Sequence, residues 1–142
     1  MMIKEIQTMS KVNDYLSECG TYFLATTDGD QPKLRPLGLH FEADGKTLFG
    51  LGDFKDVYRQ MVANPKVEIV ALKPDRHHWL RYTGTAVFET DPKYANSILE
   101  SSPYLQTIYN KETGYNLAIF HLEDATCVDI DMMGPGEDLL TE

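Results

Sequence analysis

Apolar residues recur at helical spacing at the beginning of the chain. They stand three or four residues apart, as on one face of an α-helix: Ile3, Ile6, Met9, Val12 and Leu16. Gly20 follows as a natural terminator, because glycine readily ends a helix. The spacing therefore predicts a helix over about residues 2–18.

Short runs rich in β-branched and aromatic residues follow, bounded by turn signals. The tight-turn pairs Asp28-Gly29 and Asp44-Gly45 separate the first of these runs. Pro36 interrupts one run and indicates a bulge or an edge position, and Gly84 marks a bend in another. The predicted strands cover residues 21–27, 33–42, 46–52, 66–73 and 79–90.

Helical periodicity returns twice. Residues 54–63 carry apolar positions at i, i+3, i+4 and i+7, and Asp53 fits the N-cap of that helix. A second helical stretch runs from Asp91 to about Asn110 and is broken near Pro103. Its cluster of Tyr104, Leu105, Ile108 and Tyr109 is interpreted as a packed helix face.

Two further strands, residues 117–122 and 125–130, complete the pattern before an acidic tail that we expect to be mobile from about residue 134. No repeat or linker divides residues 1–142, so we expect one domain. Consecutive antiparallel strands interrupted by two or three helices predict an α+β fold, a small β-barrel with helices packed outside.

Charge and composition exclude several functions. The chain has 13 Lys and Arg against 22 Asp and Glu, a net charge of −9, which disfavours binding to nucleic acid or to an anionic membrane surface. No apolar run approaches the roughly 20 residues of a membrane span. Cys19 and Cys127 are far apart, as expected for reduced thiols. We therefore expect a cytoplasmic protein.

The four histidines do not suggest a metal site. They fall on separate predicted elements, and the adjacent pair would point to opposite sides of a strand: His40, His77, His78 and His121. Surface or hydrogen-bonded histidines explain them better, and no metal is expected. No Ser-His-Asp arrangement can be placed, so no catalytic residue is assigned.

Residues 33–67 combine the groups that bind a phosphate. Arg35 lies beside a strand proline, a strand ends at Leu51-Gly52, and Lys55 lies in the first turn of the next helix. Cations and backbone N–H donors at a helix N-terminus attract anions. The alternative is that both cations are solvated surface charges and that Asp53 is only a cap.

The order of several segments resembles the pyridoxamine-phosphate-oxidase-like family of FMN-binding split barrels. The matching segments span about residues 20–90: Arg35-Pro36-Leu37-Gly38, the 51–55 strand-to-helix junction, KDVYRQ at 55–60, NPKV at 64–67, and the 79–84 strand. The resemblance implies a six-stranded antiparallel split β-barrel with flanking helices. It also implies a homodimer that holds FMN in clefts between the subunits.

The resemblance also implies the cofactor-binding residues, which are Arg35, Pro36, Leu37, Gly38, Leu51, Gly52, Lys55, Gln60 and Trp79. Arg35 and Lys55 would contact the FMN phosphate, and the two strand segments would follow the flavin or its ribityl chain with their backbone. Gln60 would supply a polar contact. Trp79 would come from the partner subunit, or would be an ordinary surface aromatic residue.

Two departures from the family pattern matter. The segment Gly52-Asp53-Phe54-Lys55 carries an aspartate where many relatives have hydroxyl side chains, and this carboxylate would repel a phosphate unless it turns away as a cap. Residues 134–142 contain neither the tryptophan nor the arginine that holds substrate phosphate in pyridoxamine phosphate oxidases. Oxidation of a vitamin precursor is therefore not expected.

The expected function is an FMN-dependent oxidoreductase. Electrons would pass from a reduced nicotinamide, NAD(P)H, through FMN to a small acceptor such as a nitroaromatic, as in the nitroimidazole-reductase-like branch that the KDVYRQ helix resembles. The alternative is a non-catalytic flavin- or haem-binding carrier or stress-related redox sensor on the same fold. A deazaflavin is a third possibility, but its charged tail would need more basic residues around the cleft.

Overall fold

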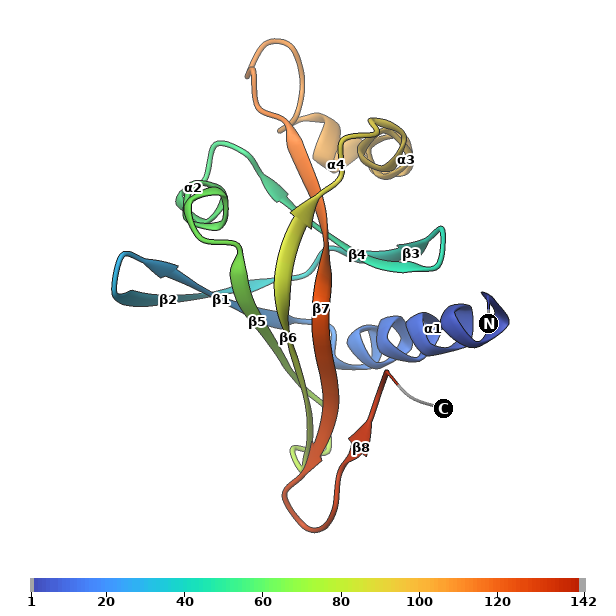
Figure 1. Cartoon of the computed structure of the whole chain (residues 1–142). Coiled ribbons are helices and arrows are strands. Elements are labelled where there is room, and N and C mark those ends of the chain that lie inside the picture. The colour runs from blue at the N-terminus through green and yellow to red at the C-terminus, as the bar shows by residue number, and fades with distance from the viewer. Residues whose placement is uncertain (1, 141–142) are drawn as a thin grey trace.

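The chain forms an α+β fold in which helices flank a curled sheet, as the sequence predicts (Figure 1). The computed structural model describes residues 2–140, with side chains described from residue 11 onward, so Ile3, Ile6 and Met9 of the predicted helical face lie outside the described side chains. In chain order the elements are α1 (Met2–Cys19), β1 (Tyr22–Asp28), β2 (Gln31–Leu37), β3 (His40–Ala43), β4 (Lys46–Gly52), α2 (Asp56–Ala63), β5 (Lys66–Leu72), β6 (His78–Phe88), α3 (Lys93–Ser101), α4 (Pro103–Gln106), β7 (Leu117–Asp131) and β8 (Glu137–Asp138).

The sheet closes through one short corner of the chain. Its strand order is β2-β1-β5-β6-β7-β4-β3, with β8 added to β7. Although β2 and β3 stand at opposite ends of this order, only Gly38 and Leu39 separate them in the chain. The Leu39 carbonyl accepts a hydrogen bond from Tyr22 Oη at 2.7 Å and another from the Gly50 N–H at 3.4 Å. The corner thus ties the two edges of a split barrel together.

The structure divides one predicted strand. Residues 33–42 form β2 and β3 rather than a single strand, and the break falls at Gly38 and Leu39 instead of at Pro36. Pro36 stays in β2 because this edge strand pairs only with β1, so a proline there is tolerated.

The structure also merges two predicted strands into one. Residues 117–131 form the continuous strand β7 rather than two strands, although Asp124 has a positive φ of 49°. The pairing of β6 with β7 shifts between Thr83 and Thr85, which confirms the irregularity that Gly84 marks. An added Cβ at Gly84 would lie 2.9 Å from the Ala125 Cβ. The irregular pairing therefore accommodates the positive φ of Asp124 without ending β7.

Side chains alternate between a buried and an exposed face of the sheet. The register aligns Leu24, Ile69, Tyr82 and Cys127 across β1, β5, β6 and β7, and all four are at most 3% exposed. The opposite side, called the outer face below, carries Phe23, Leu34, Pro36, Val70, Leu72, Trp79, Val128 and Ile130. Phe23, Leu34 and Leu72 are 38%, 66% and 46% exposed. One sheet therefore presents apolar residues on both sides.

The C-terminal residues are docked on β7. β8 pairs with β7, and the Leu139 N–H donates to the Cys127 carbonyl at 2.7 Å. The Leu139 side chain is 1% exposed. The prediction of a mobile tail from about residue 134 does not account for these contacts. The acidic composition concealed this anchor, because Leu139 and Leu140 are flanked by polar and charged residues in the sequence.

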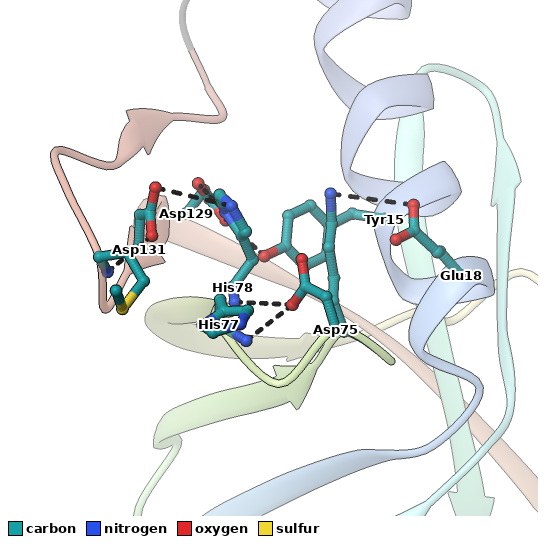
Figure 2. Close-up of polar contacts among 9 residues, drawn as sticks. Tyr15, Glu18, Asp75, His77, His78, Asp129 and Asp131 are labelled. Carbon is teal, nitrogen blue, oxygen red and sulfur yellow. Dashed lines mark hydrogen bonds and ion pairs between the residues drawn. The ribbon is translucent and has the colours of Figure 1, made fainter.

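A polar cluster fastens α1 to one end of the barrel (Figure 2). Tyr15 Oη of α1 donates to Asp129 Oδ1 of β7 at 2.5 Å, and His78 Nδ1 of β6 lies 3.0 Å from Asp129 Oδ2. His78 Nε2 lies 3.6 Å from Asp131, and the Asp75 carboxylate accepts the backbone N–H of His78 at 3.0 Å. The hydrogen bond to Asp129 raises the pKa of His78 above its ordinary value. The cluster therefore favours the protonated imidazole.

Two negative findings concern the described residues. None of their helices is long and apolar enough to cross a membrane. No group of three or more His, Cys, Asp or Glu side chains among residues 11–140 is arranged to hold a metal ion.

The raised pKa of His78 makes stability depend on pH. Its contribution is complete below the unfolded-state pKa of about 6.5 and is lost as the pH rises through the folded-state value. We expect the urea midpoint of the wild-type protein to be lower at pH 8 than at pH 6, and His78→Gln to reduce that difference. His77→Gln, which changes the exposed neighbour, is the control. An equal difference in wild type and His78→Gln would contradict this assignment.

Candidate functional site

Arg35 is held at the barrel wall by three hydrogen bonds. It lies on β2 opposite Leu24 of β1, where α2 packs over the sheet. Its Nη1 donates to Thr26 Oγ1 at 2.7 Å and to the Leu24 carbonyl at 3.1 Å, and its Nη2 donates to Gln60 Oε1 at 2.8 Å. Thr26 Oγ1 also donates to Gln60 Oε1 at 2.6 Å. Thr26, Arg35 and Gln60 form what we call the Arg35 cluster.

The Arg35 cluster holds the Arg35 guanidinium in an orientation that suits the binding of an anion. A guanidinium has five N–H donors in a rigid fork, and the three bonds above leave two that contact no other described residue. Partial burial lowers the pKa of Arg35, but a guanidinium remains protonated at physiological pH. Thr26 and Gln60 are 3% and 9% exposed, so their contacts with Arg35 are shielded from water. The guanidinium is therefore fixed and charged.

Lys55 precedes α2, and Gln60 lies in the middle of that helix. The five-residue separation corresponds to about 7.5 Å along a helix axis, so the Arg35 cluster and Lys55 flank the same short helix. The Lys55 side chain is exposed, with its Nζ 5.9 Å from the centroid of the Phe54 ring. The two cations predicted to contact the phosphate, Arg35 and Lys55, thus both lie beside the eight-residue helix α2.

The predicted N-cap is wrong. Lys55 occupies the N-cap position of α2 and makes no side-chain cap, whereas Asp53 lies further back in the turn. The Asp53 carboxylate accepts hydrogen bonds from the backbone and the side-chain amide of Asn116, both at 3.0 Å. These two bonds turn the carboxylate toward residue 116 instead of the helix. Sequence spacing could not reveal this partner, because it lies 63 residues away.

At the end of β4, Leu51 and Gly52 can offer a ligand backbone groups rather than side chains. Leu51 is 3% exposed in the core, and an added Cβ at Gly52 would lie 2.6 Å from Phe54 Cε1. The Gly52 carbonyl accepts the Lys55 N–H at 3.2 Å, which fixes the turn into α2. A larger side chain at residue 52 would displace the Phe54 ring.

The remaining β2 residues point in different directions. Pro36 belongs to the outer face, and Leu37 is half-buried against the core. Gly38 is exposed at the corner between β2 and β3, and a Cβ there would meet no atom within 4 Å. Steric crowding within the described chain therefore does not explain a glycine at position 38.

Trp79 lies far from Gly52 and Lys55 of the same chain. It pairs with Ile130 near the end of β7, whereas Gly52 pairs with Leu117 at the beginning of that strand. The intervening residues span roughly 40 Å along β7, at about 3.3 Å per residue. Trp79 is half-buried on the outer face, with the Arg81 guanidinium 4.8 Å from its ring centroid. One chain therefore does not bring Trp79 and Lys55 together.

A cleft of about 510 Å³ opens beside the end of β4. We call it the upper cleft because it lies near α2 and α3 at the top of Figure 1. Its walls carry four aromatic residues: Tyr58, Phe88, Tyr109 and Tyr115. The interpretation of residues 104, 105, 108 and 109 as one packed helix face is only partly right: Tyr109 packs against a hydrophobic cluster and lines the cleft, but it lies beyond α4, and Tyr104 is 73% exposed.

Sequence analysis missed the upper cleft and Thr26. A signal for Thr26 existed, since it continues the inward alternation of Tyr22 and Leu24 with a hydroxyl group. No comparable signal marked Tyr109 and Tyr115, because the connection that carries them has no regular period.

Comparisons with known proteins agree with this architecture. The family model for pyridoxamine 5'-phosphate oxidase matches residues 8–125. A NimC/NimA family protein from Clostridium acetobutylicum is 31% identical, covers 96% of this chain and 94% of its own, and superposes with a TM-score of 0.84. No curated protein matched the chain.

Two more distant structures share the fold. A pyridoxamine 5'-phosphate oxidase-related, FMN binding protein from Nostoc punctiforme is 18% identical over 89% of this chain and 82% of its own, with a TM-score of 0.60. A heme binding protein from Mycobacterium smegmatis is 12% identical over 96% of this chain and 57% of its own, with a TM-score of 0.64. The family match and the 31% identical structure confirm the resemblance: the chain belongs to the pyridoxamine 5'-phosphate oxidase family.

Proposed function

We propose that the protein is an FMN-binding oxidoreductase that passes electrons from a reduced nicotinamide to a small acceptor such as a nitroaromatic. The observation that carries the proposal is the Arg35 cluster, a fixed guanidinium with two available donors beside the helix that Lys55 begins. Family membership supports the cofactor, since the related structure from Nostoc punctiforme is described as FMN binding.

The residues around α2 fit a phosphate group. Arg35 and Lys55 supply two positive charges, and charge-assisted hydrogen bonds to phosphate are stronger than neutral ones. The aspartate that departs from the family pattern is turned toward Asn116, which donates to both Asp53 oxygens. The overall charge of −9 is therefore compatible with a local anion site.

Each part of the chain has a separate task in this proposal. Thr26 and Gln60 hold the Arg35 guanidinium so that it meets a phosphate without further reorganisation. Backbone groups of Leu37, Gly38 and the β4 end orient the rest of the cofactor. FMN, when bound, supplies hydride and electron transfer that side chains cannot perform. No acid or base on the chain is assigned, because hydride transfer does not require one.

We further propose that the outer face forms a homodimer interface, which would bring Trp79 to the partner subunit. Five neighbouring strands present apolar side chains there around one ion pair, Arg81 with Glu68, and Leu34 is 66% exposed. Contiguous exposed apolar surface typically marks an interaction site. Trp79 and Pro36 lie on this same face, so a second copy could place a tryptophan near β2 although one chain does not.

A non-catalytic flavin- or haem-binding carrier or stress-related redox sensor is the second candidate. The similarity to the Mycobacterium smegmatis heme binding protein favours it. Three histidines already contact other side chains: His78 contacts Asp129, His40 contacts Asn13 and His121 contacts Glu123. A haem iron would therefore compete with these contacts at three of the four histidines, whereas the imidazole of His77 is exposed.

Removing the Lys55 charge tests the phosphate site. We expect Lys55→Ala to weaken FMN binding by roughly tenfold or more, because a hydrogen bond to a charged group contributes about 1.5–3 kcal/mol. Lys55 is exposed, so the fold should be unaffected. Lys66→Ala, which removes an exposed lysine at the start of β5, is the matched control. Fluorescence titration of FMN measures both constants, and equal affinities would reject the site.

Charge on the outer face tests the dimer. Leu34→Glu should convert a dimer to a monomer in light scattering, because a carboxylate would be buried in an apolar interface. Val62→Glu introduces the same charge on α2 at a residue that is 61% exposed and away from the outer face. A monomeric wild type, or the same mass for both variants, would refute the interface.

Turnover separates an oxidoreductase from a carrier. The purified protein with bound FMN should oxidise reduced nicotinamide continuously when a nitroaromatic is added, and faster than free FMN at the same concentration. The measurement is the loss of nicotinamide absorbance over many equivalents of protein. Flavin binding without sustained oxidation by either NADH or NADPH would instead favour the carrier.

A further inference from the structure

Aromatic side chains from separate parts of the chain form two walls of the upper cleft. Tyr58 of α2 packs against Phe88 of β6 with ring centroids 4.9 Å apart. Tyr115, in the connection that precedes β7, stacks on Phe54 at 3.9 Å with an interplanar angle of 19°. Tyr115 lines the cleft and Phe54 does not, so Phe54 supports the Tyr115 ring from outside. The Tyr115 ring is thus held in place where a planar group of a ligand can stack on it.

Asn96 lines the cleft with a side-chain amide that contacts no other described residue. It lies on the exposed side of α3. The amide of Asn110, also in the lining, already donates to the Gln106 carbonyl at 2.9 Å. The amide of Asn116 donates to Asp53 at 3.0 Å. An amide offers a donor and an acceptor side by side, which is the pattern that pairs with the edge of adenine. Asn96 is therefore the amide that is available to a ligand of this kind.

The two carboxylates of the lining differ in what they already contact. Glu89 Oε1 lies 2.9 Å from Lys46 Nζ and 2.9 Å from His121 Nδ1. Asp91 Oδ1 accepts the Lys93 N–H at 3.0 Å, whereas Asp91 Oδ2 lies 4.0 Å from Lys93 Nζ and accepts no hydrogen bond from the described residues. That oxygen can accept a hydroxyl group, as an acidic side chain does from the ribose in dinucleotide sites.

The charges of the lining suit a nucleoside better than a polyphosphate. Among the described residues of the lining, two carboxylates stand against a single cation, Lys111. Phosphate groups are held by converging cations and backbone N–H donors. A ribose instead donates its hydroxyl groups to carboxylates. The lining therefore favours a ligand with hydroxyl donors over one with several negative charges.

We infer that the upper cleft binds an adenine ribonucleoside. The base stacks on Tyr115, the Asn96 amide pairs with the 6-amino group and a neighbouring ring nitrogen, and Asp91 accepts a ribose hydroxyl. The cleft volume of about 510 Å³ lies in the range of small-molecule sites. A nucleoside both donates and accepts hydrogen bonds, so it matches a lining that does the same.

The nucleoside site adjoins the proposed cofactor site. Tyr109 lines the cleft and also covers Gly52, because an added Cβ at Gly52 would lie 3.0 Å from Tyr109 Oη. Arg35 and Lys55, the proposed phosphate ligands, do not line the cleft. The adenosine half of a nicotinamide dinucleotide carries the group that this site recognises. That such a dinucleotide is the natural ligand rests on the proposed function, whereas the nucleoside site does not.

The test is an NMR titration of ¹⁵N-labelled purified protein with adenosine. We expect saturable shifts of the amide signals around Asn96, Tyr109 and Tyr115. Purine riboside lacks the 6-amino donor and 2'-deoxyadenosine lacks one ribose hydroxyl, so both should bind more weakly. Shifts confined to another surface, or equal affinity for all three nucleosides, would overturn the inference.

Two variants assign the polar contacts. Asn96→Leu should weaken adenosine binding by about fivefold or more and remove the preference over purine riboside. Asp91→Asn keeps an oxygen for the Lys93 N–H, loses the charge, and should reduce the preference over 2'-deoxyadenosine. Glu100→Leu, on α3 and outside the cleft, is the control and should change neither preference. Wild-type preferences in both cleft variants would overturn the assignment.

A third variant tests the stacking wall. Tyr115→Ala should weaken all three nucleosides alike, by about fivefold or more, because an aromatic ring stacks on each base equally. Tyr104→Ala removes a tyrosine that is 73% exposed and outside the cleft, and should leave affinity unchanged. Wild-type affinity in Tyr115→Ala would contradict the proposed position of the base.

The outcomes distinguish this inference from the proposed function. If adenosine binds the cleft but the protein fails to bind FMN, the proposed function is wrong and the nucleoside site stands. If FMN binds with the expected loss in Lys55→Ala but adenosine does not bind, the nucleoside site is wrong alone. Displacement of adenosine by FMN, in wild type and Lys55→Ala alike, would assign the cleft to the flavin and overturn the inference. Competition by AMP and by NADH then distinguishes a free nucleotide from a nicotinamide dinucleotide.

Discussion

The two-residue corner at Gly38 and Leu39 is the constraint on which the barrel depends. The strands it joins stand at opposite edges of the sheet, so the sheet must curl until β1 and β4, the neighbours of the edge strands, meet the same carbonyl. Tyr22 holds that carbonyl from the β1 side, and Gly50 approaches it from β4. An added Cβ at Gly50 would lie 2.5 Å from Leu39 Cδ2, so glycine allows the close approach. Curvature in turn positions β2 and α2 around the Arg35 cluster.

Local patterns predicted most of the fold. The alternation in β1 and β5, the turn pairs at residues 28–29 and 44–45, and the helical period of α2 are all set by near neighbours in sequence. The errors arose where the local structure depends on a partner that is distant in the sequence. Residues 117–131 stay one strand because β6 pairs with β7 on both sides of the bulge at Asp124 and Ala125, and Leu139 is fixed because the Cys127 carbonyl of β7 accepts its N–H.

The candidate site was predictable in its residue types and not in its contacts. Arg35, Lys55 and Gln60 could be located because the family resemblance assigns them roles by position. Asp53 could not be understood from sequence, since its spacing fits a cap equally well and only the fold reveals Asn116 as its partner. The rings of the upper cleft were missed for the same reason, whereas the alternation of buried positions in β1 did mark Thr26 as an inward residue. Side chains that meet only after folding leave no periodic signal.

The late position of β7 has a consequence for synthesis of the chain. The hairpins β1–β2, β3–β4 and β5–β6 each pair neighbours in sequence, whereas β4 meets β7 through pairs such as Phe49 with Phe120, half the chain away. During synthesis on the ribosome, β4 therefore lacks its partner strand β7 until residues 117–120 have emerged. Barrel closure therefore follows the synthesis of β7, and such non-local pairing folds slowly. A nascent chain paused before residue 117 would expose Leu48, Phe49 and Leu51, and would be a natural client for a chaperone that binds apolar segments.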